Sequence, residues 1–403
     1  MSRVLLLARE LPHPPNAGDR IVTHGFVRAL AARGHDVHVL AYRRDGDESD
    51  AAALREPCAS VRRIPSADSP LPPTARKLAN YARGRSDVMA MFDSRAFRVV
   101  AAQRVREVDP DVVLAQHPYI GQVVRDERVA RAIDETGARV VTNAHVVEYA
   151  AHRRFRECTD DPSTRAELAL EIPLLRRSEL AVYEASDRTL VLGERDRERL
   201  DALDALDVRV QRVALDADAY RPADPAAAVP DRLLFFGSYN WFPNRDGIAW
   251  FVEEILPTVR RARPDVELLV AGRGAPESIR NLGDRPNVRF VGEVEDLAPL
   301  VRSASAVVAP LRVGGGVRIK VLESMAWGVP VVTTPSGFEG VEATPGEDLL
   351  VPDSAEGFAD ATVRLLEDGR LRERIARNAR GTIRKRYSTD AVADRLEENL
   401  GLR

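Results

Sequence analysis

The chain has 403 residues, of which 44% are hydrophobic and 30% charged, a composition typical of a globular protein with two or three domains. Its 59 basic and 62 acidic groups leave a formal net charge of −3, which gives no reason to expect nucleic acid as a partner. The two cysteines, Cys58 and Cys158, have no spacing that suits a disulfide framework or a zinc site. We therefore expect a protein of a reducing cytoplasm.

The first half of the chain alternates short apolar runs with helical patterns. Residues 3–8 (RVLLLA) predict a buried parallel strand, and a polar loop containing Pro and Gly follows it. The spacing of Ile21, Phe26 and Leu30 then indicates a helix that ends near Gly34. Further strands are predicted over 36–42, 111–116, 139–144 and 188–193, with a long Arg- and Glu-rich helix over roughly 163–185.

Residues 67–92 interrupt this alternation and mix apolar with cationic side chains. The segment predicts an insertion that forms a helical flap, and the alternative is a contact with an acceptor or with a membrane surface. No stretch of the chain approaches the ~18 apolar residues of a membrane-spanning helix. The apolar run at the N-terminus is also too short for a signal sequence. We therefore expect at most a peripheral contact with the inner face of a membrane.

The alternation restarts after residues 216–231, which are rich in Pro, Ala and Asp. This composition predicts a linker. The elements predicted beyond it are strands at 232–237, 266–272, 288–292, 305–311 and 330–334, and helices at about 244–262, about 316–327 and from about 355 onward. Strands and helices that alternate on both sides of a linker predict two doubly wound α/β domains. We place these domains at 1–215 and 232–385, with a C-terminal helix over 386–403 that can pack back on the first domain.

The most informative stretch is residues 314–332, GGGVRIKVLESMAWGVPVV, which joins a predicted strand to a predicted helix. Ligands of such sheets collect at the carboxyl ends of the strands. Close backbone approach and outward-pointing N–H groups are expected at the three glycines, Gly314, Gly315 and Gly316. Arg318 and Lys320 add two charges at a helix N-terminus, which is itself positive. The pattern predicts a site for a multiply charged oxyanion, most naturally a diphosphate.

Glu323 lies one turn after Lys320, so the two side chains share a helix face. A carboxylate beyond a phosphate clamp suits the paired hydroxyls of a ribose, as acidic residues do in dinucleotide sites. The alternative is that Arg318 and Lys320 are solvated helix charges and that Glu323 pairs with Lys320. The complete pattern, glycine loop included, favours a nucleoside diphosphate.

These motifs resemble those of the retaining glycosyltransferases of the GT-B fold, specifically glycosyltransferase family 4. The resemblance covers nearly the whole chain, is strongest over 232–340, and is carried by FFGSYNWFPNRDGIAWF, VAGRG, VGEVEDL and GVPVV in that order. It implies an α/β protein with two doubly wound, Rossmann-like domains facing across a cleft. It also implies a nucleotide-sugar donor held mainly by the second domain, an acceptor held by the first, and no required metal.

The chain departs from the family pattern at two places. Glu323 matches the second Glu of the E-x7-E motif, which holds the donor ribose, but the first Glu would fall at Gly315. Branches of the family that share this glycine arrangement are expected to contact the donor through the glycine amides. The family also often places an Arg/Lys pair in the loop after Gly237, where this chain has no cation before Arg245. The resemblance therefore implies that Arg318 and Lys320 take over the neutralisation of the diphosphate, and we predict them to be catalytic.

The resemblance implies further donor-binding positions at strand ends and loops, namely Gly237, Gly272, Arg273 and Glu339. Gly272 and Arg273 belong to VAGRG, where the family reads the base of the nucleotide. A plainer interpretation of Glu339 is a carboxylate that caps the next segment.

On the acceptor side, Asn16, Gly18 and Arg20 resemble the loop that faces donor and acceptor. His145 follows a predicted strand and matches the family's histidine of the first domain, so we predict a catalytic role for it, with Glu148 one turn later to orient it. His117 has the same kind of place. Both histidines have the plainer interpretation of polar loop residues.

The sequence thus predicts a metal-independent hexosyltransferase that moves a sugar from a nucleotide diphosphate sugar, with UDP or GDP as the expected nucleotide, to a sugar or a lipid-linked saccharide. No other cofactor is expected. The alternatives are a nucleotide-sugar epimerase of similar fold, and a non-catalytic nucleotide-sugar binding subunit, which the missing first Glu motivates. A nicotinamide oxidoreductase is disfavoured because no acidic residue follows the GxG at the required distance and context.

Overall fold

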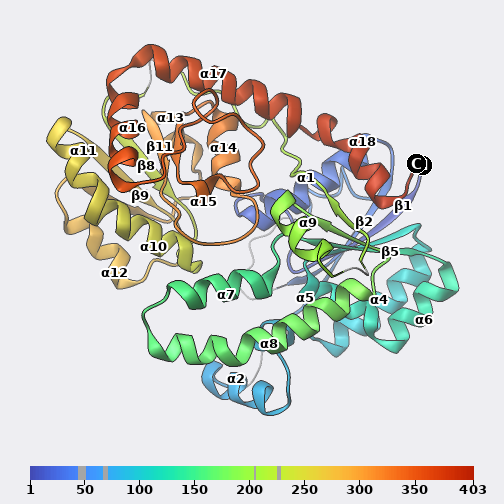
Figure 1. Ribbon diagram of the computed structural model, residues 1–403. Coiled ribbons are helices and arrows are strands. Elements are labelled where there is room, and N and C mark those ends of the chain that lie inside the picture. Colours follow the sequence, from blue (N-terminus) through green and yellow to red (C-terminus); the bar gives the residue numbers. More distant parts are fainter. Residues whose placement is uncertain (44–50, 67–70, 204–205, 225–227) are drawn as a thin grey trace. The chain divides into compact units, whose positions relative to one another are not determined.

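The computed structural model describes residues 1–43, 51–66, 71–203, 206–224 and 228–403, which form two compact units (Figure 1). The first unit contains Met1–Leu215 together with Thr389–Arg403, and the second contains Asp216–Ser388. Residues 67–70 of the predicted insertion and 225–227 of the predicted linker lie outside the described residues. The described part of the predicted linker packs on the second unit, where the Ala223 N–H donates to the Trp327 carbonyl at 2.8 Å.

Within the described residues, seven parallel strands form the sheet of the first unit, in the order β3-β2-β1-β4-β5-β6-β7. Their bounds are β1 Arg3–Ala8, β2 Asp36–Arg43, β3 Ser60–Pro65, β4 Val112–Gln116, β5 Arg139–Ala144, β6 Arg188–Val191 and β7 Val208–Val210. The helices of this unit are α1 Gly18–Ala32, α2 Pro73–Ala82, α3 Asp87–Ala90, α4 Arg95–Val108, α5 Pro118–Gly121, the 3₁₀ turn Gln122–Arg125, α6 Glu127–Thr136, α7 Glu148–Cys158, α8 Pro162–Glu184, α9 Glu194–Asp201 and α18 Thr389–Leu400.

Helices cover both faces of this sheet, and β1 shows why. Val4, Leu5, Leu6 and Leu7 are all completely buried, and Leu5 and Leu7 belong to a hydrophobic core that also contains Phe97 of α4. Because neighbouring side chains of a strand point to opposite faces, Val4 and Leu6 must be covered from the other side. A continuous apolar run such as RVLLLA is therefore the pattern of a parallel strand buried on both faces.

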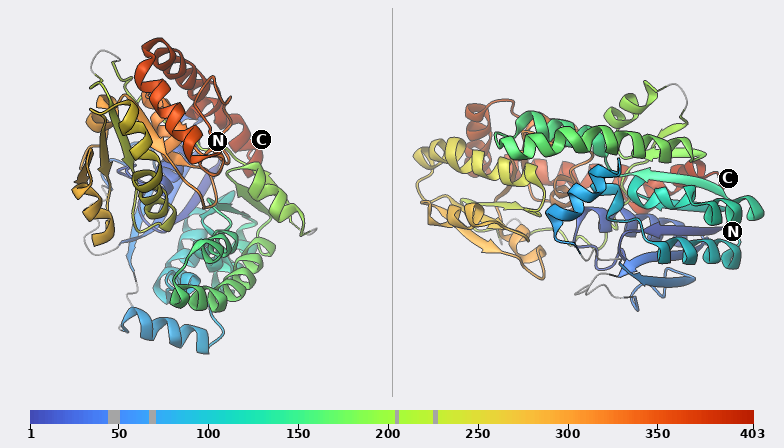
Figure 2. Two further views of the ribbon diagram at one scale, coloured as in Figure 1. Left: turned by 60° about the vertical axis from the view of Figure 1, so that its left-hand side comes forward. Right: turned by 90° about the horizontal axis from the view of Figure 1, so that it is seen from below.

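The helices of the first unit include pairs that are far apart in the sequence or joined by a short turn. Figures 1 and 2 show α7 and the long helix α8 running side by side. The Lys77 ammonium of α2 contacts the Glu167 carboxylate of α8 at 2.5 Å. The C-terminal helix α18 packs on α1, and His35 Nε2 lies 2.9 Å from Glu397 Oε1.

In the second unit, five parallel strands of the described chain form a sheet in the order β10-β9-β8-β11-β12. Their bounds are β8 Arg232–Phe236, β9 Glu267–Ala271, β10 Val288–Gly292, β11 Ala306–Ala309 and β12 Val331–Thr333. The helices are α10 Phe242–Trp250, a π-helical turn Phe251–Ile255, α11 Leu256–Ala262, α12 Glu277–Arg280, the 3₁₀ turn Asn281–Asp284, α13 Ala298–Ser303, α14 Ile319–Trp327, α15 Pro335–Phe338, α16 Ala355–Glu367 and α17 Gly369–Arg386. The α/β class with two doubly wound sheets is as the sequence predicts.

The winding direction reverses beside the first strand of each sheet. In the first unit β2 and β4 lie on opposite sides of β1, and in the second unit β9 and β11 lie on opposite sides of β8. Ligands of open α/β sheets bind outside the carboxyl ends of the strands at this switch point. A binding site is therefore expected at the loops that follow β1, β4, β8 and β11.

Gly25 of α1 tests the packing of the first unit. A Cβ atom at this position would lie 1.8 Å from the carbonyl oxygen of Ala214, which is itself completely buried. We expect Gly25→Ala to lower the free energy of unfolding by about 1–3 kcal/mol or more, because the helix and the strand-following segment must separate. The matched control is Gly381→Ala in α17, where nothing lies within 4 Å of the added atom. That variant should gain up to about 1 kcal/mol from helix propensity, and equal losses in both variants by denaturant titration would contradict the packing.

Candidate functional site

The loop after β11 contains the glycines predicted to approach an anion. Gly314 has φ 129° and Gly316 has φ 71°, both in the region that favours glycine. The helix after them begins at Ile319 and not at residue 316, so Arg318 is the residue that precedes α14. The glycine loop is therefore longer, and the helix shorter, than the sequence pattern predicts.

Arg318 is buried and its guanidinium contacts the loop itself. It donates to the backbone carbonyls of Gly315 and, at 3.5 Å, Ser336. A Cβ atom on Gly314 would lie 2.6 Å from Arg318 Nη2. Arg318 thus ties the glycine loop to α15, the short helix after β12, which differs from the prediction of a charge directed at a ligand from the first helical turn.

Lys320 lies in the first turn of α14 and its ammonium reaches the end of β8. Lys320 Nζ donates to Asn244 Oδ1 at 2.6 Å and lies 4.3 Å from the centre of the Phe235 ring. Burial, and then the nearby Arg318, lower the pKa of Lys320 to about 7, although Glu323 acts in the opposite direction. With a pKa near 7, the Lys320 amine is only partly protonated at neutral pH, and an anion beside it would favour the charged form.

Glu323 is half-buried on the same helix. Its Oε1 accepts from the Tyr220 hydroxyl at 3.4 Å, and the Tyr220 ring packs edge-on against Trp327 at 4.9 Å. Burial raises the pKa of Glu323 to about 8, while Tyr220 and Lys320 work against that rise. A carboxyl group in this state can both donate to and accept from paired hydroxyls.

Of the other predicted donor-side residues, the structure brings Gly237 and Gly272 together. A Cβ atom on Gly272 would lie 1.8 Å from the carbonyl oxygen of Gly237, so the ends of β8 and β9 approach as only glycine allows. Arg273 is half-buried, and its carbonyl accepts from the Tyr239 N–H at 2.9 Å. Glu339 follows α15 in the loop that precedes Gly340, and is half-buried.

In the first unit, the end of β1 and the start of α1 share a network of charged side chains. Arg9 Nη2 lies 2.5 Å from Asp19 Oδ2 and 3.1 Å from Glu10 Oε1, and Arg20 contacts the other oxygen of Glu10. Burial works to raise the pKa of Asp19, but Arg9 and then His145 hold it below its usual value. Of the three predicted residues of this loop, Arg20 also donates to Asn16 at 3.4 Å, and Gly18 is the first residue of α1.

The two predicted histidines lie against each other at the ends of β4 and β5. The ring centres of His117 and His145 are 3.9 Å apart, and His117 stacks on Tyr119 at 4.7 Å. His145 Nε2 lies 2.8 Å from Gln116 Oε1, so Gln116, and not Glu148, orients this ring. Burial lowers the pKa of His145 to about 4 and holds the pKa of His117 well below its usual value. Both rings are therefore neutral near pH 7.

Several buried polar atoms in this cluster have no hydrogen-bond partner among the described residues, namely both ring nitrogens of His117, Gln116 Nε2 and Asn143 Oδ1. His117 also has φ 74°, which is uncommon for a residue other than glycine. Beside these atoms lies a cavity of about 10 Å³, lined by residues that include Glu10, Asp19, Gln116 and His117. A space of this size and polarity holds one water molecule or one hydroxyl group.

Glu148 begins α7, and a carboxylate from α8 caps this helix. The completely buried Glu179 accepts from the N–H groups of Glu148 and Tyr149, both at 2.9 Å, and from the Tyr183 hydroxyl at 2.5 Å. Burial raises the pKa of Glu179 to about 7, and its neighbour Glu148 adds to the rise. Burial likewise raises the pKa of Glu148 to about 7. The cap fixes the turn that carries His145.

Family models match both units of the chain. The model described as Glycosyl transferases group 1 matches residues 230–368, and the model described as Glycosyl transferase 4-like domain matches residues 18–216. The chain belongs to the group 1 glycosyltransferases. The family resemblance seen in the sequence is thereby confirmed.

Solved structures share the GT-B fold of this glycosyltransferase over its full length. Sucrose-phosphate synthase from Thermosynechococcus elongatus is 20% identical, with a TM-score of 0.70 over 99% of this chain and 98% of the other. The Anabaena protein Alr3699/HepE in complex with UDP and glucose is 14% identical, with a TM-score of 0.68 over 100% of both chains. Phosphatidyl-myo-inositol mannosyltransferase of Mycobacterium leprae is 34% identical over 192 residues, which are 45% of this chain and 50% of that protein. The glycosyltransferase thus spans only about half the length of this curated relative.

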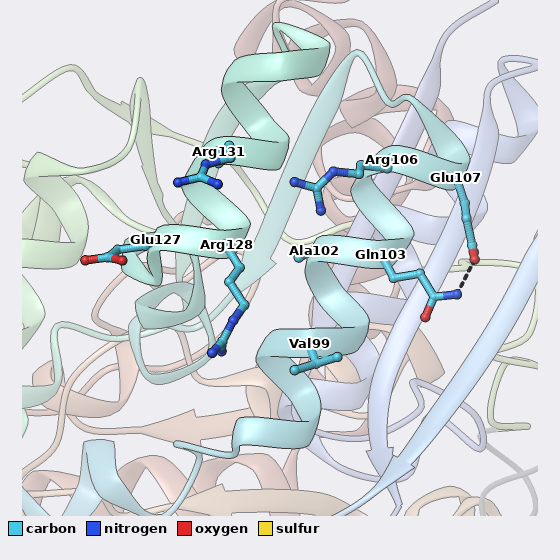
Figure 3. Close-up of a pocket in the computed structure, with 8 residues that line it drawn as sticks. All are labelled: Val99, Ala102, Gln103, Arg106, Glu107, Glu127, Arg128 and Arg131. Carbon is cyan, nitrogen blue, oxygen red and sulfur yellow. Dashed lines mark hydrogen bonds between the residues drawn. The ribbon is translucent and has the colours of Figure 1, made fainter.

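A larger cavity of the glycosyltransferase, of about 560 Å³, lies away from the strand ends, between α4 and α6 (Figure 3). Arginines of both helices line it, and it contains none of the predicted site residues. In the described residues no group of three or more His, Cys, Asp or Glu side chains is placed to hold a metal ion. No described helix has the length and apolar character that crossing a membrane requires.

Several residues at the site are not among those that the sequence predicts. Arg9, Glu10 and Asp19 follow the first predicted strand, so their place at a strand end was available as a signal. Asn244 and Glu179 lie within helical patterns and look like any polar helix residue. Only the contacts of their side chains set them apart.

Glu179 allows a test of the α7 cap. Glu179→Ala leaves two helix N–H groups and a hydroxyl without an acceptor, so we expect the free energy of unfolding to fall by about 1–3 kcal/mol. Because its pKa is raised to about 7 in the folded protein from an ordinary 4.5, the wild type loses stability as pH rises through that window. Glu179→Gln does not titrate, so its stability relative to the wild type should improve from about pH 5 to about pH 8. Denaturant titrations across this range measure both effects. If the difference in free energy of unfolding between Glu179→Gln and the wild type does not depend on pH, the pKa of Glu179 is not raised by burial.

Proposed function

We propose that this glycosyltransferase moves a hexose from a nucleotide diphosphate sugar to an acceptor hydroxyl with retention of the anomeric configuration, in the assembly of a glycan, polysaccharide or glycolipid. The observation that carries the proposal is the arrangement at the ends of β8 and β11. There the glycine loop, the Lys320 ammonium and the Glu323 carboxyl lie on consecutive parts of one loop and helix. The UDP complex of the Anabaena protein supports a nucleotide-bound donor.

On the donor side, we assign the diphosphate to the Lys320 ammonium and to the N–H groups of Gly314, Gly315 and Gly316. Arg318 holds this loop and adds positive charge beside it. Glu323, one turn further along α14, takes the paired ribose hydroxyls. Gly237, Gly272 and Arg273 lie at the ends of β8 and β9 on the side where the base is expected, and Glu339 is assigned to the sugar end. UDP and GDP are the expected nucleotides.

On the acceptor side, we assign hydroxyl recognition to the cluster of Gln116, His117 and His145. Neutral imidazole rings both donate and accept, and the cluster already has buried polar atoms that lack a partner. Asn16, Gly18 and Arg20 belong to the adjoining loop, and Glu148 begins the helix after His145. The relative named as a phosphatidyl-myo-inositol mannosyltransferase supports a sugar or lipid-linked saccharide as acceptor.

In the proposed reaction the bond between the anomeric carbon and the diphosphate oxygen breaks. A bond forms between the anomeric carbon and the acceptor oxygen, whose proton passes to the departing diphosphate. Negative charge grows on the diphosphate in the transition state, and Lys320 with the loop N–H groups stabilises it. No protein nucleophile and no bound metal takes part, so a chelator should leave the rate unchanged.

A second candidate function is a subunit that binds a nucleotide sugar without transferring it, because Gly315 stands where the family motif has its first Glu. Incubation of the purified protein with labelled UDP- and GDP-sugars separates the two. A glycosylated product, or slow hydrolysis of the donor, supports transfer. Tight binding with neither outcome supports the binding subunit, and an isomerised donor supports an epimerase.

The charged residues of the second unit provide the sharpest test of the donor assignment. Lys320→Ala removes a charge-assisted hydrogen bond worth roughly 1.5–3 kcal/mol, so donor affinity and transfer rate should fall about 10- to 150-fold. Arg318→Ala should lower donor affinity and transfer rate by a similar factor, because the glycine loop loses the side chain that holds it in place. Arg245→Ala, on α10 but outside these contacts, is the control and should change both by less than about threefold. Calorimetric titration of donor and a transfer assay measure the effects, and equal small changes in all three variants would sink the assignment.

We also propose that α2 meets an anionic membrane surface on which a lipid-linked acceptor is presented. None of the residues of α2 is buried; Leu78 is 63% exposed, and Leu170 of the adjoining α8 is 57% exposed. Cationic side chains flank them, among them Lys77 and Arg83. Exposed apolar and cationic groups together suit the boundary between headgroups and acyl chains.

Sedimentation with vesicles tests the membrane contact. We expect binding to vesicles that contain phosphatidylglycerol but not to vesicles of phosphatidylcholine alone, because of the cationic side chains. Leu78→Glu should abolish this binding, while Val229→Glu, at an exposed apolar residue of the second unit, should not. Binding that is the same for all three proteins would contradict the proposal.

A further inference from the structure

The Lys320 ammonium is held by groups that come from a different part of the sequence. Its nitrogen lies 2.6 Å from Asn244 Oδ1 and 4.3 Å from the centre of the Phe235 ring, the next-to-last residue before Gly237. A Cβ atom on Gly237 would lie 2.7 Å from the same nitrogen. The lysine that belongs to α14 therefore delivers its charge to the carboxyl end of β8.

Asn244 is tied at both ends of its amide group. It is 7% exposed, and its Nδ2 donates to the carbonyl oxygen of Ser238 at 2.7 Å while its Oδ1 accepts from Lys320. A carbonyl can only accept and an ammonium can only donate, so these two partners fix which way the amide points. The carbonyl of Ser238, in the loop between β8 and α10, therefore fixes the position of Asn244 Oδ1, which accepts from Lys320.

We propose that Asn244 is a positioning residue that holds the Lys320 ammonium at the end of β8, where the diphosphate of the donor binds. The inference rests on the proposed function for the identity of the ligand. The geometry alone carries the contact between the amide and the ammonium.

The neutral amide suits this task better than a carboxylate. A carboxylate at residue 244 would hold the lysine more strongly, but it would cancel the charge that the phosphate oxygens need. The amide uses one of the three N–H donors of the ammonium and leaves the others for an anion. Two further charged groups act on Lys320 from its own segment, Arg318, which opposes its protonation, and Glu323, which favours it.

Gly237 belongs to the same arrangement. A side chain there would lie within 2.7 Å of Lys320 Nζ and 2.9 Å of Asn244 Nδ2. It would displace the amide and the ammonium together. Gly237 therefore serves by leaving room for this pair.

The plainer role for Asn244 is to fix the start of α10 through Ser238, with no effect on the lysine. The two roles differ in what they do to the protonation of Lys320. Loss of a structural tie weakens binding by the same factor at every pH. Loss of the oxygen that accepts from the ammonium makes the ammonium easier to deprotonate, so binding weakens most at high pH.

The protonation of Lys320 can be measured without any donor, because lysine occurs in the chain only at Lys77, Lys320 and Lys385. NMR of protein labelled at the lysine side chains gives three signals, and Lys320→Ala identifies the one of interest. In Asn244→Ala the pKa of Lys320 should fall by about one unit, and in Asn244→Asp it should rise by at least as much. Asn378→Ala, at an exposed residue of α17, is the matched control and should leave the signal unchanged. A pKa that is the same in all four proteins would overturn the proposal.

Titration with a nucleotide sugar completes the test, since its esterified diphosphate does not itself titrate between about pH 6 and about pH 8. Asn244→Ala should bind the donor at least about tenfold more weakly at pH 8 but within about threefold of the wild type at pH 6. Asn244→Asp should bind weakly at both, because its carboxylate cancels the charge. If Asn244→Ala loses the same factor of donor affinity at both pH values while its thermal stability is unchanged, Asn244 has only a structural role. If the wild type binds no nucleotide sugar while the NMR result holds, the proposed function fails and the positioning of Lys320 stands.

Discussion

The reversal of winding direction beside β1 and β8 is the constraint on which both candidate sites depend. Helices that leave the two strands at a switch point cover opposite faces of the sheet, so no helix covers the carboxyl ends of that pair. In the second unit this leaves the loops after β8 and β11 to meet, and the glycines in them bring backbone rather than side chains to the meeting place. In the first unit the same reversal brings the charged network after β1 beside His117 after β4.

Partial burial gives both sites charge states that respond to a ligand. Lys320 and Glu323 lie one turn apart. Burial lowers the pKa of Lys320 and raises the pKa of Glu323, so it favours the neutral form of each side chain. An anion beside Lys320 stabilises the protonated amine, as hydration does for an exposed lysine. The positive charge of the site therefore increases when the ligand binds. In the first unit, burial instead keeps His117 and His145 neutral, which suits hydroxyl groups and not phosphates. The two units therefore differ in the kind of ligand that their electrostatics favour.

The sequence predicts elements well where burial on both faces produces a continuous apolar run, as in β1, β8 and β9. It misses β3, whose segment SVRRIP exposes two arginines at the edge of the sheet and therefore shows no apolar run. Among site residues, the glycine loop and the charges after it were visible because unusual residues are adjacent in the chain. Asn244 and Gln116 were not, because a polar residue in a helix or strand gives no sign of its partner across the fold.

Arg318 and Lys320 show how a shift of three residues in a helix boundary changes the chemistry read from a sequence. With a helix from residue 316, both would lie at its N-terminal end, where the sequence predicts that both charges neutralise one diphosphate. Because α14 begins at Ile319, Arg318 still belongs to the loop, and its side chain turns back onto the carbonyls of Gly315 and Ser336. Lys320 lies within the helix, where side chains lean toward the N-terminus, and that direction carries its ammonium to β8. The two cations therefore have different roles. Arg318 holds the glycine loop in place, and Lys320 places its positive charge at the end of β8.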